Sequence, residues 1–307
     1  SNGYNTRSKK LEIEMTFINK LIGADNKIEL RKIQEDWIPN VEPRLLESEK
    51  FLLNPRHLVC FLDLETTGLI EKEDKIIELA LKLAAVNAES GELIGVLYEY
   101  QSFNDPKEPI DEEVTRINGI TNEMVQDQSI DWEVVHSILN TADIIVAHNA
   151  RFDRGFMDRY IPISKEKIWA CSVNDIDWIN RGFTSSKQEL LCYWHGFYYD
   201  SHRAMSDVDA LIYLVTHQFQ DDVGRYILEL VQNAYKPFYH LKIPFGYDEA
   251  KKDKAKANKY RWDGTVWSKI LKDSNQIDEE VQWAEENIYD GHFSGTVEEI
   301  PLTDKYK

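Results

Sequence analysis

The chain of 307 residues contains few cysteines and no long apolar run. Cys60, Cys171 and Cys192 form no CxxC pair, so neither a disulfide framework nor a structural zinc site is expected. A reducing cytoplasm suits such a sequence. No apolar run approaches the ~18 residues that a membrane helix needs, and no charged-then-apolar leader opens the chain. We therefore expect a cytoplasmic protein that does not enter a membrane.

Basic residues are scarce in the middle of the chain. Residues 57–220 contain 13 Lys and Arg against 28 Asp and Glu, and the whole chain has a formal net charge of −18. Because phosphate contacts need Lys and Arg, this acidic segment is a poor general binder of duplex nucleic acid. It could still hold metal ions, whose charge would offset the local repulsion.

Three regions follow one another along the chain, which at 42% hydrophobic residues can bury a sizeable core. Residues 1–56 are expected to form a helical N-terminal extension, with helices over 8–22 and over 25–38. This extension either packs on the main domain or docks a partner. Residues 57–220 form the central domain, and residues 221–307 form a small C-terminal extension.

The central region alternates between two kinds of pattern. The apolar, strand-like segments are 57–65, 75–86, 93–101, 143–149 and 168–173. The helix-like segments are 111–118, 131–140, 153–160, 186–195 and 206–220. Turn residues at 87–91 predict a hairpin between the second and third strands. Strands that first meander and then alternate with helices predict an α/β fold, a mixed sheet flanked by helices.

Two carboxylates lie in the first of these strands. Asp63 and Glu65 are two residues apart, so the period of a strand places both side chains on one face. Burying two ionised carboxylates is costly, but their repulsion is tolerable if they share a hard cation such as Mg²⁺. The alternative is that this face of the strand meets water.

Two later segments carry further candidates. Asp153 ends the segment His148-Asn-Ala-Arg-Phe-Asp153, which follows a buried strand and enters a helix, so helix capping is its alternative role. His202 precedes Asp207 with four residues between them, and it is the one side chain of the group that exchanges protons near neutral pH. Asp207 falls in the first turn of a helix, where the helix dipole alone favours a carboxylate.

Together these residues form the ordered pattern Asp63-x-Glu65, Asp153, His202-x₄-Asp207. The pattern resembles that of the DEDDh 3′–5′ exonucleases, the family of the proofreading epsilon subunit of bacterial DNA polymerase III. The resemblance covers roughly residues 57–220. The segments that carry it are Phe61-Leu-Asp-Leu-Glu-Thr-Thr-Gly68, Ile117-Asn-Gly-Ile-Thr121, Ala147-His-Asn-Ala-Arg-Phe-Asp153 and His202-Arg-Ala-Met-Ser-Asp-Val-Asp-Ala210.

One position departs from the family pattern. Many members carry His where this chain has Asn118. The position is not a metal ligand in the family, so the departure puts substrate contacts in doubt and leaves the chemistry intact.

The resemblance implies a ribonuclease H-like fold and hydrolysis with two divalent cations, Mg²⁺ or Mn²⁺. By carry-over, Asp63 contacts both ions, Glu65 and Asp207 hold the ion that activates water, and Asp153 holds the other directly or through water. His202 takes the proton from the attacking water. The product is a nucleoside 5′-monophosphate released from the 3′ end of the strand.

The resemblance also implies which residues contact the substrate. Thr66, Thr67 and Gly68 would meet the 3′-terminal nucleotide. Asn149 and Phe152 flank the third carboxylate, and the Phe152 ring would offer a stacking face, with core packing as the alternative.

The substrate is expected to be the 3′ end of single-stranded or frayed DNA. RNA remains an alternative, because no residue decides whether a ribose 2′-OH is accepted. A catalytically inactive module that binds nucleic-acid ends is a third interpretation. A polymerase or repair partner is left open.

The C-terminal region contains a basic run, Lys251–Arg261. It either supplies phosphate contacts or is a solvated linker, and the linker is the favoured interpretation. Tyr260-Arg-Trp-Asp-Gly264 with Trp267 resembles a short element found after some exonuclease domains of the family. We expect its aromatic residues to pack together.

Overall fold

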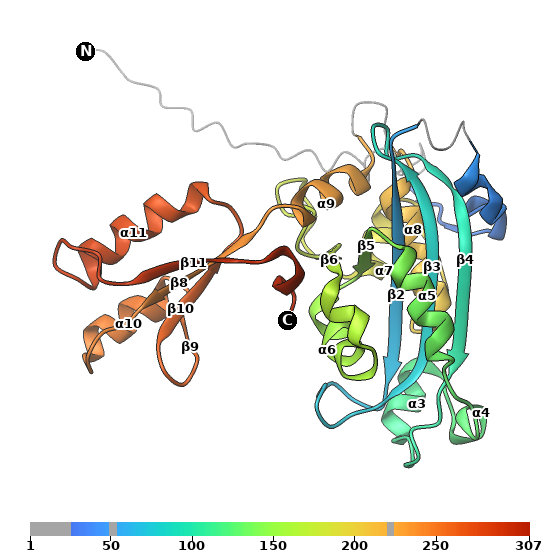
Figure 1. Cartoon of the computed structure of the whole chain (residues 1–307), viewed down its shortest axis with the longest axis horizontal. Helices are drawn as coiled ribbons and strands as arrows, with labels where there is room; N and C mark the ends of the chain where they lie inside the picture. Colours follow the sequence, from blue (N-terminus) through green and yellow to red (C-terminus); the bar gives the residue numbers. More distant parts are fainter. Residues whose placement is uncertain (1–25, 49–53, 220–223) are drawn as a thin grey trace.

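The computed structural model describes residues 26–48, 54–219 and 224–307 (Figure 1). The predicted helix over 8–22 lies outside these residues. A five-stranded mixed sheet has the strand order β4-β3-β2-β5-β6. Its strands are β2 Arg56–Thr66, β3 Ile76–Asn87, β4 Leu93–Phe103, β5 Ile144–Ala147 and β6 Ile168–Cys171. β2, β3 and β4 are antiparallel, and β5 and β6 run parallel to β2. The mixed sheet and the β3–β4 hairpin are confirmed.

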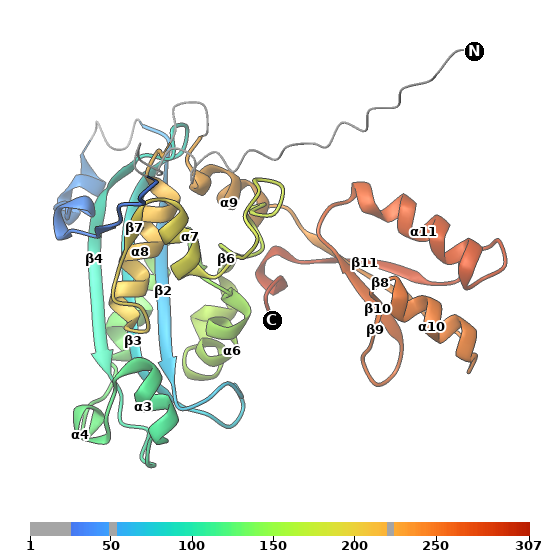
Figure 2. The same ribbon diagram turned by 180° about the vertical axis from the view of Figure 1, so that it is seen from behind.

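Helices cover both faces of this sheet (Figure 2). The helices on one face are α7 Gln188–Trp194, α8 Ala204–Thr216 and α9 Tyr226–Ala234, and those on the other are α5 Trp132–Thr141 and α6 Ala150–Tyr160. β2 serves both cores because its side chains alternate. Val59 and Phe61 pack towards α8, whereas Leu62 and Leu64 pack towards α6. The period of the strand therefore places Asp63 and Glu65 on the α8 face.

Two short helices follow the hairpin. α3 Glu112–Asn118 and α4 Asn122–Val125 lie at the end of the sheet to which β2 points (Figure 1). α3 was predicted, whereas the single turn of α4 was not. α3 ends at Gly119, whose φ of 72° is the left-handed conformation that glycine adopts without strain. This end of the sheet carries the candidate site.

The predicted helix over 25–38 is wrong. Arg31–Lys32 form the short strand β1, parallel to β7 Phe197–Tyr198, and Glu35–Trp37 form a 3₁₀ turn. The backbone N–H of Ile33 donates to the carbonyl of Tyr198 at 2.9 Å. Ile33, Trp37 and Ile38 pack on the α8 core from this extended segment.

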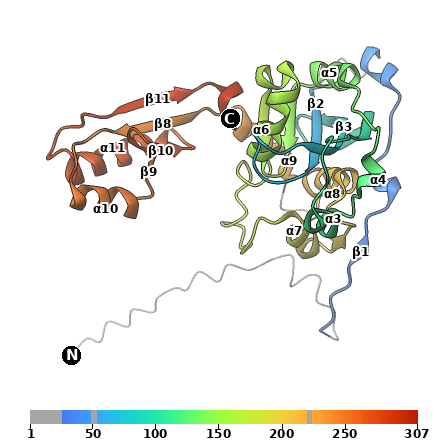
Figure 3. The same cartoon turned by 90° about the horizontal axis from the view of Figure 1, so that it is seen from below.

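A second, antiparallel sheet lies beside the first and has the order β11-β8-β10-β9 (Figure 3). Its strands are β8 Phe238–Ile243, β9 Arg261–Trp262, β10 Trp267–Leu271 and β11 Thr296–Ile300. Helices α10 Glu249–Ala257 and α11 Asn275–Asn287 pack against it around a core that includes Leu241, Ala255 and Ala284. The basic run is therefore mostly helix, and the favoured interpretation as a linker is wrong. Aromatic packing is confirmed for Tyr260, whose ring stacks on that of Trp283 at 5.4 Å.

The end of the chain returns to the first sheet. The buried guanidinium of Arg154 in α6 donates to the carbonyl of Thr303. Lys305 donates from Nζ to the carbonyl of Asn233 at 2.8 Å and lies 3.8 Å from Asp175. Within the described part of the chain, no helix combines the length and apolar character that a membrane crossing requires.

Candidate active site

Three carboxylates meet above the end of β2. Asp63 and Glu65 project from the strand, and Asp207 lies in the first turn of α8, which packs across β2 and β3. One oxygen of each carboxylate lies within 4.8 Å of the others. The alternation of side chains along β2 and the packing of α8 across the sheet thus bring the three carboxylates together.

Asp153 approaches the same site from the opposite face of the sheet. It lies in the first turn of α6 and is only 2% exposed. Its carboxylate accepts a hydrogen bond from the backbone of Leu64, between the two strand carboxylates. Asn149 occupies the N-cap position of α6, so Asp153 does not cap this helix.

The acidic residues repel one another in the absence of a cation. Burial and the neighbouring Asp207 and Asp153 raise the pKa of Asp63 well above its usual value. Burial raises the pKa of Glu65 to about 7 and that of Asp207 to about 6. A half-buried cluster of oxygen donors in which every pKa is raised matches what Mg²⁺ or Mn²⁺ requires. The residues present therefore fit a divalent cation.

Hydrogen bonds fix Asp207 in place. The Tyr199 hydroxyl donates to Oδ1 at 2.9 Å, and the backbone N–H of Arg203 donates to Oδ2 at 3.1 Å. Gln188 links both residues, because its Nε2 lies 3.1 Å from the Tyr199 oxygen and 2.9 Å from the carbonyl of Asp207. Sequence reasoning missed Tyr199 and Gln188, which lie outside the motifs.

Asn118 is buried and contacts Glu65. Its Nδ2 donates to Oε2 of Glu65 at 3.3 Å, and its Oδ1 accepts from the backbone N–H of Ile120 at 3.0 Å. The departure at this position was expected to affect substrate contacts alone. The structure corrects that expectation, because this amide holds one of the clustered carboxylates.

A further carboxylate, Glu78, was also missed. It is fully buried on β3 opposite Glu65, and its oxygens accept from Gln101 at 2.8 Å and from the backbone N–H of Ala204 at 3.3 Å. The Arg203 guanidinium lies 3.4 Å away. Glu78 thus anchors the start of α8, next to His202. The one available signal was an acid inside the mostly apolar run that forms β3.

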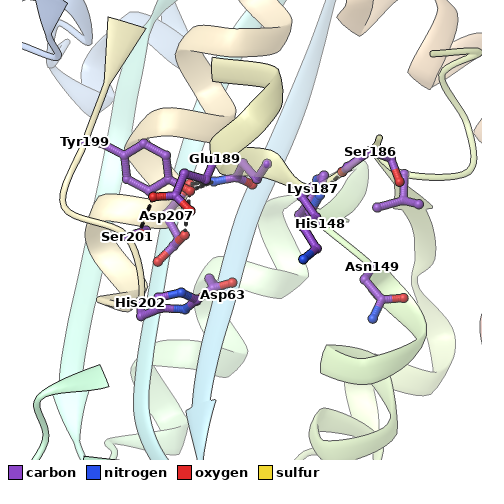
Figure 4. A pocket seen from close by; sticks show the side chains of 12 residues that line it. Asp63, His148, Asn149, Ser186, Lys187, Glu189, Tyr199, Ser201, His202 and Asp207 are labelled. Atoms are coloured by element: carbon purple, nitrogen blue, oxygen red, sulfur yellow. Dashed lines mark hydrogen bonds between the residues drawn. The ribbon is translucent and has the colours of Figure 1, made fainter. Parts of the chain in front are cut away.

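The two histidines of the motifs differ in environment. His202 is exposed, has a left-handed φ of 64° and lines a cavity with Asp63 and Asp207 (Figure 4). His148 lines that cavity too, but its ring nitrogens lie 2.7 Å from Ser172 Oγ and 2.7 Å from the Ser186 carbonyl. Burial lowers the pKa of His148 to about 4. His202 is therefore the accessible proton carrier.

Two cavities of about 570 and 540 Å³ meet at the carboxylates. The larger one is lined by Asp63, Glu65, Thr66, Thr67, Gly68, Phe152, Asp153, His202 and Asp207, and the smaller one adds Asn149. The structure thus brings together all the site residues that were predicted from the sequence. The Phe152 ring lines the larger cavity and also packs against the ring of Phe156, with centroids 5.1 Å apart.

The loop after β2 is held closed by Asp74. Its Oδ2 accepts from the backbone N–H of Ile70 at 2.7 Å, and Thr67 N donates to the Lys75 carbonyl at 2.9 Å. A side chain at Gly68 would collide with the Asp74 carboxylate at 2.5 Å. The turn therefore presents Thr66, Thr67 and Gly68 to the larger cavity in a defined conformation.

Comparison with known proteins agrees with this geometry. The sequence model of the RNase T family, described as Exonuclease, matches residues 60–215, half of the chain. The chain is 30% identical over 198 residues to the PolC-type DNA polymerase III of Bacillus subtilis, an alignment that covers 61% of this chain and 13% of that protein.

Two solved structures are similar as well. Exonuclease I covers 61% of this chain and 48% of its own, with 17% identity and a TM-score of 0.45. Exonuclease X in complex with 5′ overhanging duplex DNA covers 56% and 99%, with 20% identity and a TM-score of 0.40. The family match extends over every clustered acidic residue, from Asp63 to Asp207. The chain belongs to the exonuclease family, with the acidic residues and the histidine in the DEDDh order.

Proposed function

We propose that the protein is a metal-dependent 3′–5′ exonuclease that removes nucleoside 5′-monophosphates from single-stranded or frayed DNA. The observation that carries this proposal is the meeting of Asp63, Glu65 and Asp207 oxygens within 4.8 Å, with His202 on the same cavity wall. Four acids and one exposed imidazole suit phosphodiester hydrolysis.

Each residue has a distinct task in this proposal. Asp63, Glu65 and Asp207 would hold one divalent cation, and Asp153 with Asp63 would hold a second. Such ions supply charge that stabilises the attacking and leaving oxygens of the phosphate. His202 accepts the proton of the attacking water, since its imidazole is exposed and free to exchange it with solvent.

The larger cavity suits a terminal nucleotide. Leu69 and Ile117 expose 83% and 58% of their surface at its rim, and Phe152 forms part of its wall. These apolar surfaces can contact a base, while Thr66 and Thr67 present polar atoms to the sugar. A single unpaired nucleotide fits the larger cavity better than a base-paired end does, because a paired base would stay stacked inside the nucleic-acid duplex.

DNA is the favoured substrate because the Bacillus relative is a DNA polymerase that carries the similar region. Its name also supports a polymerase or repair partner for this chain. The three cysteines are all buried and unpaired, which supports a reducing, cytoplasmic location.

A paired degradation assay tests the proposal. Single strands of DNA and RNA, labelled at the 3′ or the 5′ end, are incubated with Mg²⁺, with Mn²⁺ or with EDTA. The expected result is metal-dependent, stepwise loss from the 3′ end of DNA. Faster loss from RNA would assign the enzyme to RNA, and no loss from either polymer would favour a binding module.

Variants assign the roles. Asp63→Asn and Asp207→Asn are expected to abolish hydrolysis, and His202→Ala to slow it by a factor of about 10²–10⁴. Ser206→Ala is a matched control next to Asp207, because Ser206 belongs to neither cavity. An unchanged rate in His202→Ala would remove this residue from the role of base.

A further inference from the structure

The second sheet carries an aromatic cavity of its own. It measures about 330 Å³ and is lined by Phe245, Gly246, Tyr247, Asp248, Lys252, Trp262 and Trp267. These residues come from the loop between β8 and α10, from α10 itself and from the β9–β10 pair. Trp262 and Trp267 are cross-strand partners, with ring centroids 5.8 Å apart at an angle of 52°.

These rings are not needed to build the core beneath them. Tyr247 is 92% exposed and Trp262 is 53% exposed, whereas Tyr260 is buried and stacks on Trp283. Folding alone would leave such large rings in water only at a cost, and grouped exposed apolar side chains mark binding surfaces. The stretch 236–272, which includes these residues except Trp283, is also the basic half of the C-terminal region.

The charge around the cavity favours an anionic ligand. Residues 236–272 contain 10 Lys and Arg against 4 Asp and Glu. Within the described parts of the chain, Lys251, Lys254 and Lys256 on α10 have no ion-pair partner, whereas Lys252 pairs with Glu249 at 2.9 Å. Lys252 and Lys256 are four residues apart, so they follow one another along one side of the helix from the cavity.

Two of the nearby acids already bind the backbone. Asp248 accepts from the N–H of Lys251 at 3.0 Å and so caps α10. Asp263 accepts from the N–H groups of Thr265 and Val266, each at 2.8 Å. These bonds engage the two carboxylates in local turns, whereas Lys251, Lys254 and Lys256 have no ion-pair partner in the described parts of the chain.

We propose that the aromatic cavity and the α10 lysines form a second binding site, for single-stranded nucleic acid. Bases stack on Trp262 and Tyr247, and Lys252 and Lys256 contact the phosphates. Aromatic rings beside a lysine-rich helix suit a polynucleotide better than a protein surface, which would bring aliphatic side chains and few phosphates. A single strand is required, because duplex pairing hides the faces of the bases.

The basic groups of this site offset the acidic charge of residues 57–220. The site rests on the proposed function in one respect: the nucleic-acid strand that it binds has its 3′ end at the carboxylates. The strand β10 leads from Trp267 to Leu271, and the next residue, Lys272, donates from Nζ to Asn174 Oδ1 at 3.0 Å. Asn174 adjoins Val173, a wall of the smaller catalytic cavity. The five residues of β10 span about 17 Å. One nucleic-acid strand of several nucleotides can therefore reach from the aromatic cavity to the carboxylates.

Binding measured without hydrolysis tests the site. The affinity of fluorescein-labelled single-stranded DNA of about 16 nucleotides, in the range bound by single-strand sites, is measured by anisotropy in EDTA. Tyr247→Ala and Trp262→Ala are each expected to weaken binding about 10-fold, and Trp262→Phe to restore most of it. Tyr98→Ala removes a ring that is 41% exposed on β4 and is expected to leave the affinity unchanged.

A second measurement separates this site from the catalytic one. With Mg²⁺, the variants are expected to degrade an oligonucleotide of about 4 nucleotides at the wild-type rate, because it cannot reach both sites. Wild-type affinity in both Tyr247→Ala and Trp262→Ala would overturn the proposal, as would equal losses with Tyr98→Ala. If the wild-type protein degrades no polymer but these variants still bind the long strand weakly, the second site stands and the proposed exonuclease reaction fails.

Discussion

The Tyr199 hydroxyl donates a hydrogen bond of 2.9 Å to Oδ1 of Asp207, a residue eight positions further along the chain. Burial and the adjacent carboxylate raise the pKa of Tyr199, so the hydroxyl remains protonated and acts as a donor. This bond favours the ionised form of Asp207 and opposes the effect of burial, which raises the pKa of Asp207 to about 6. Tyr199 is thus a positioning residue for a proposed metal ligand.

The variant Tyr199→Phe is expected to lower the rate of hydrolysis about 10-fold, the effect of losing one hydrogen bond to a charged group. Without the donor, the pKa of Asp207 rises further, so the acid limb of the pH–rate profile moves to higher pH. Rates measured from pH 5 to pH 9 at one fixed, subsaturating Mg²⁺ concentration, so that protonation of Asp207 can compete with the cation, check this shift. Tyr198→Phe, at the exposed neighbouring residue, is the control. A lower rate with an unmoved acid limb would contradict the electrostatic role.

Asn118 stands where many family members carry His, and it holds Glu65. Replacing it with Ala removes the 3.3 Å bond to Glu65 and leaves the backbone N–H of Ile120 without its acceptor. We expect a loss of about 1–3 kcal/mol in stability and a weaker metal affinity. Isothermal titration with Mn²⁺ and thermal unfolding measure the two effects separately. Wild-type metal affinity in Asn118→Ala would restrict this residue to a structural role in the turn.

The sequence predicted the parts of the site that depend on local periodicity. Asp63 and Glu65 had to share a face because a strand repeats every two residues. Asp207 was placed correctly for the same reason, since it falls in the first turn of a helix. Outside the site, the turn residues of Asn87–Gly91 predicted the hairpin, in which Gly91 takes a φ of 71°.

Contacts between distant segments could not be predicted in this way. Glu78 meets Ala204 across 126 residues, and neither sequence segment indicates the other. A helix was predicted over 25–38, yet pairing of β1 with β7 holds Arg31–Lys32 extended. The second sheet was missed because its strands are short, from two residues in β9 to six in β8, and leave little periodicity to read.

The acidic cluster makes stability depend on metal and pH together. Burial raises the pKa of Glu65 from 4.5 to about 7, so its contribution is most favourable below pH 4.5 and is lost as the pH rises through 7. In EDTA at pH 8, the neutral variant Glu65→Gln is therefore expected to be more stable than the wild type, by up to about 3 kcal/mol. A bound cation removes this repulsion, so Mg²⁺ is expected to raise the melting temperature of the wild type more than that of the variant.

Thermal unfolding with and without Mg²⁺ checks this prediction. The matched control is Glu89→Gln, in the β3–β4 turn and outside both catalytic cavities, which should respond to Mg²⁺ as the wild type does. If Glu65→Gln is destabilised in EDTA, the repulsion between the carboxylates is not the dominant effect at this site.

His195 provides the opposite dependence on pH. The imidazole is buried, with Nδ1 2.6 Å from the Leu191 carbonyl and Nε2 2.8 Å from the Tyr226 hydroxyl. A carbonyl only accepts, so Nδ1 carries the proton and Nε2 accepts from Tyr226. This neutral tautomer satisfies both nitrogens, and burial lowers the pKa of His195 to about 4.

Between pH 6.5 and about pH 4, the imidazole of His195 is therefore protonated in the unfolded chain and neutral in the folded protein. The stability contributed by the neutral ring is present above pH 6.5 and is lost as the pH falls towards 4. Between pH 7 and pH 5 the loss is expected to be about 2 kcal/mol. Urea unfolding in saturating Mg²⁺, which holds the carboxylates ionised, measures it: His195→Gln should lose less stability over this interval than the wild type. His136→Gln, at an exposed position on α5, should follow the wild type. Parallel pH dependences in all three proteins would show that His195 is not the group that titrates.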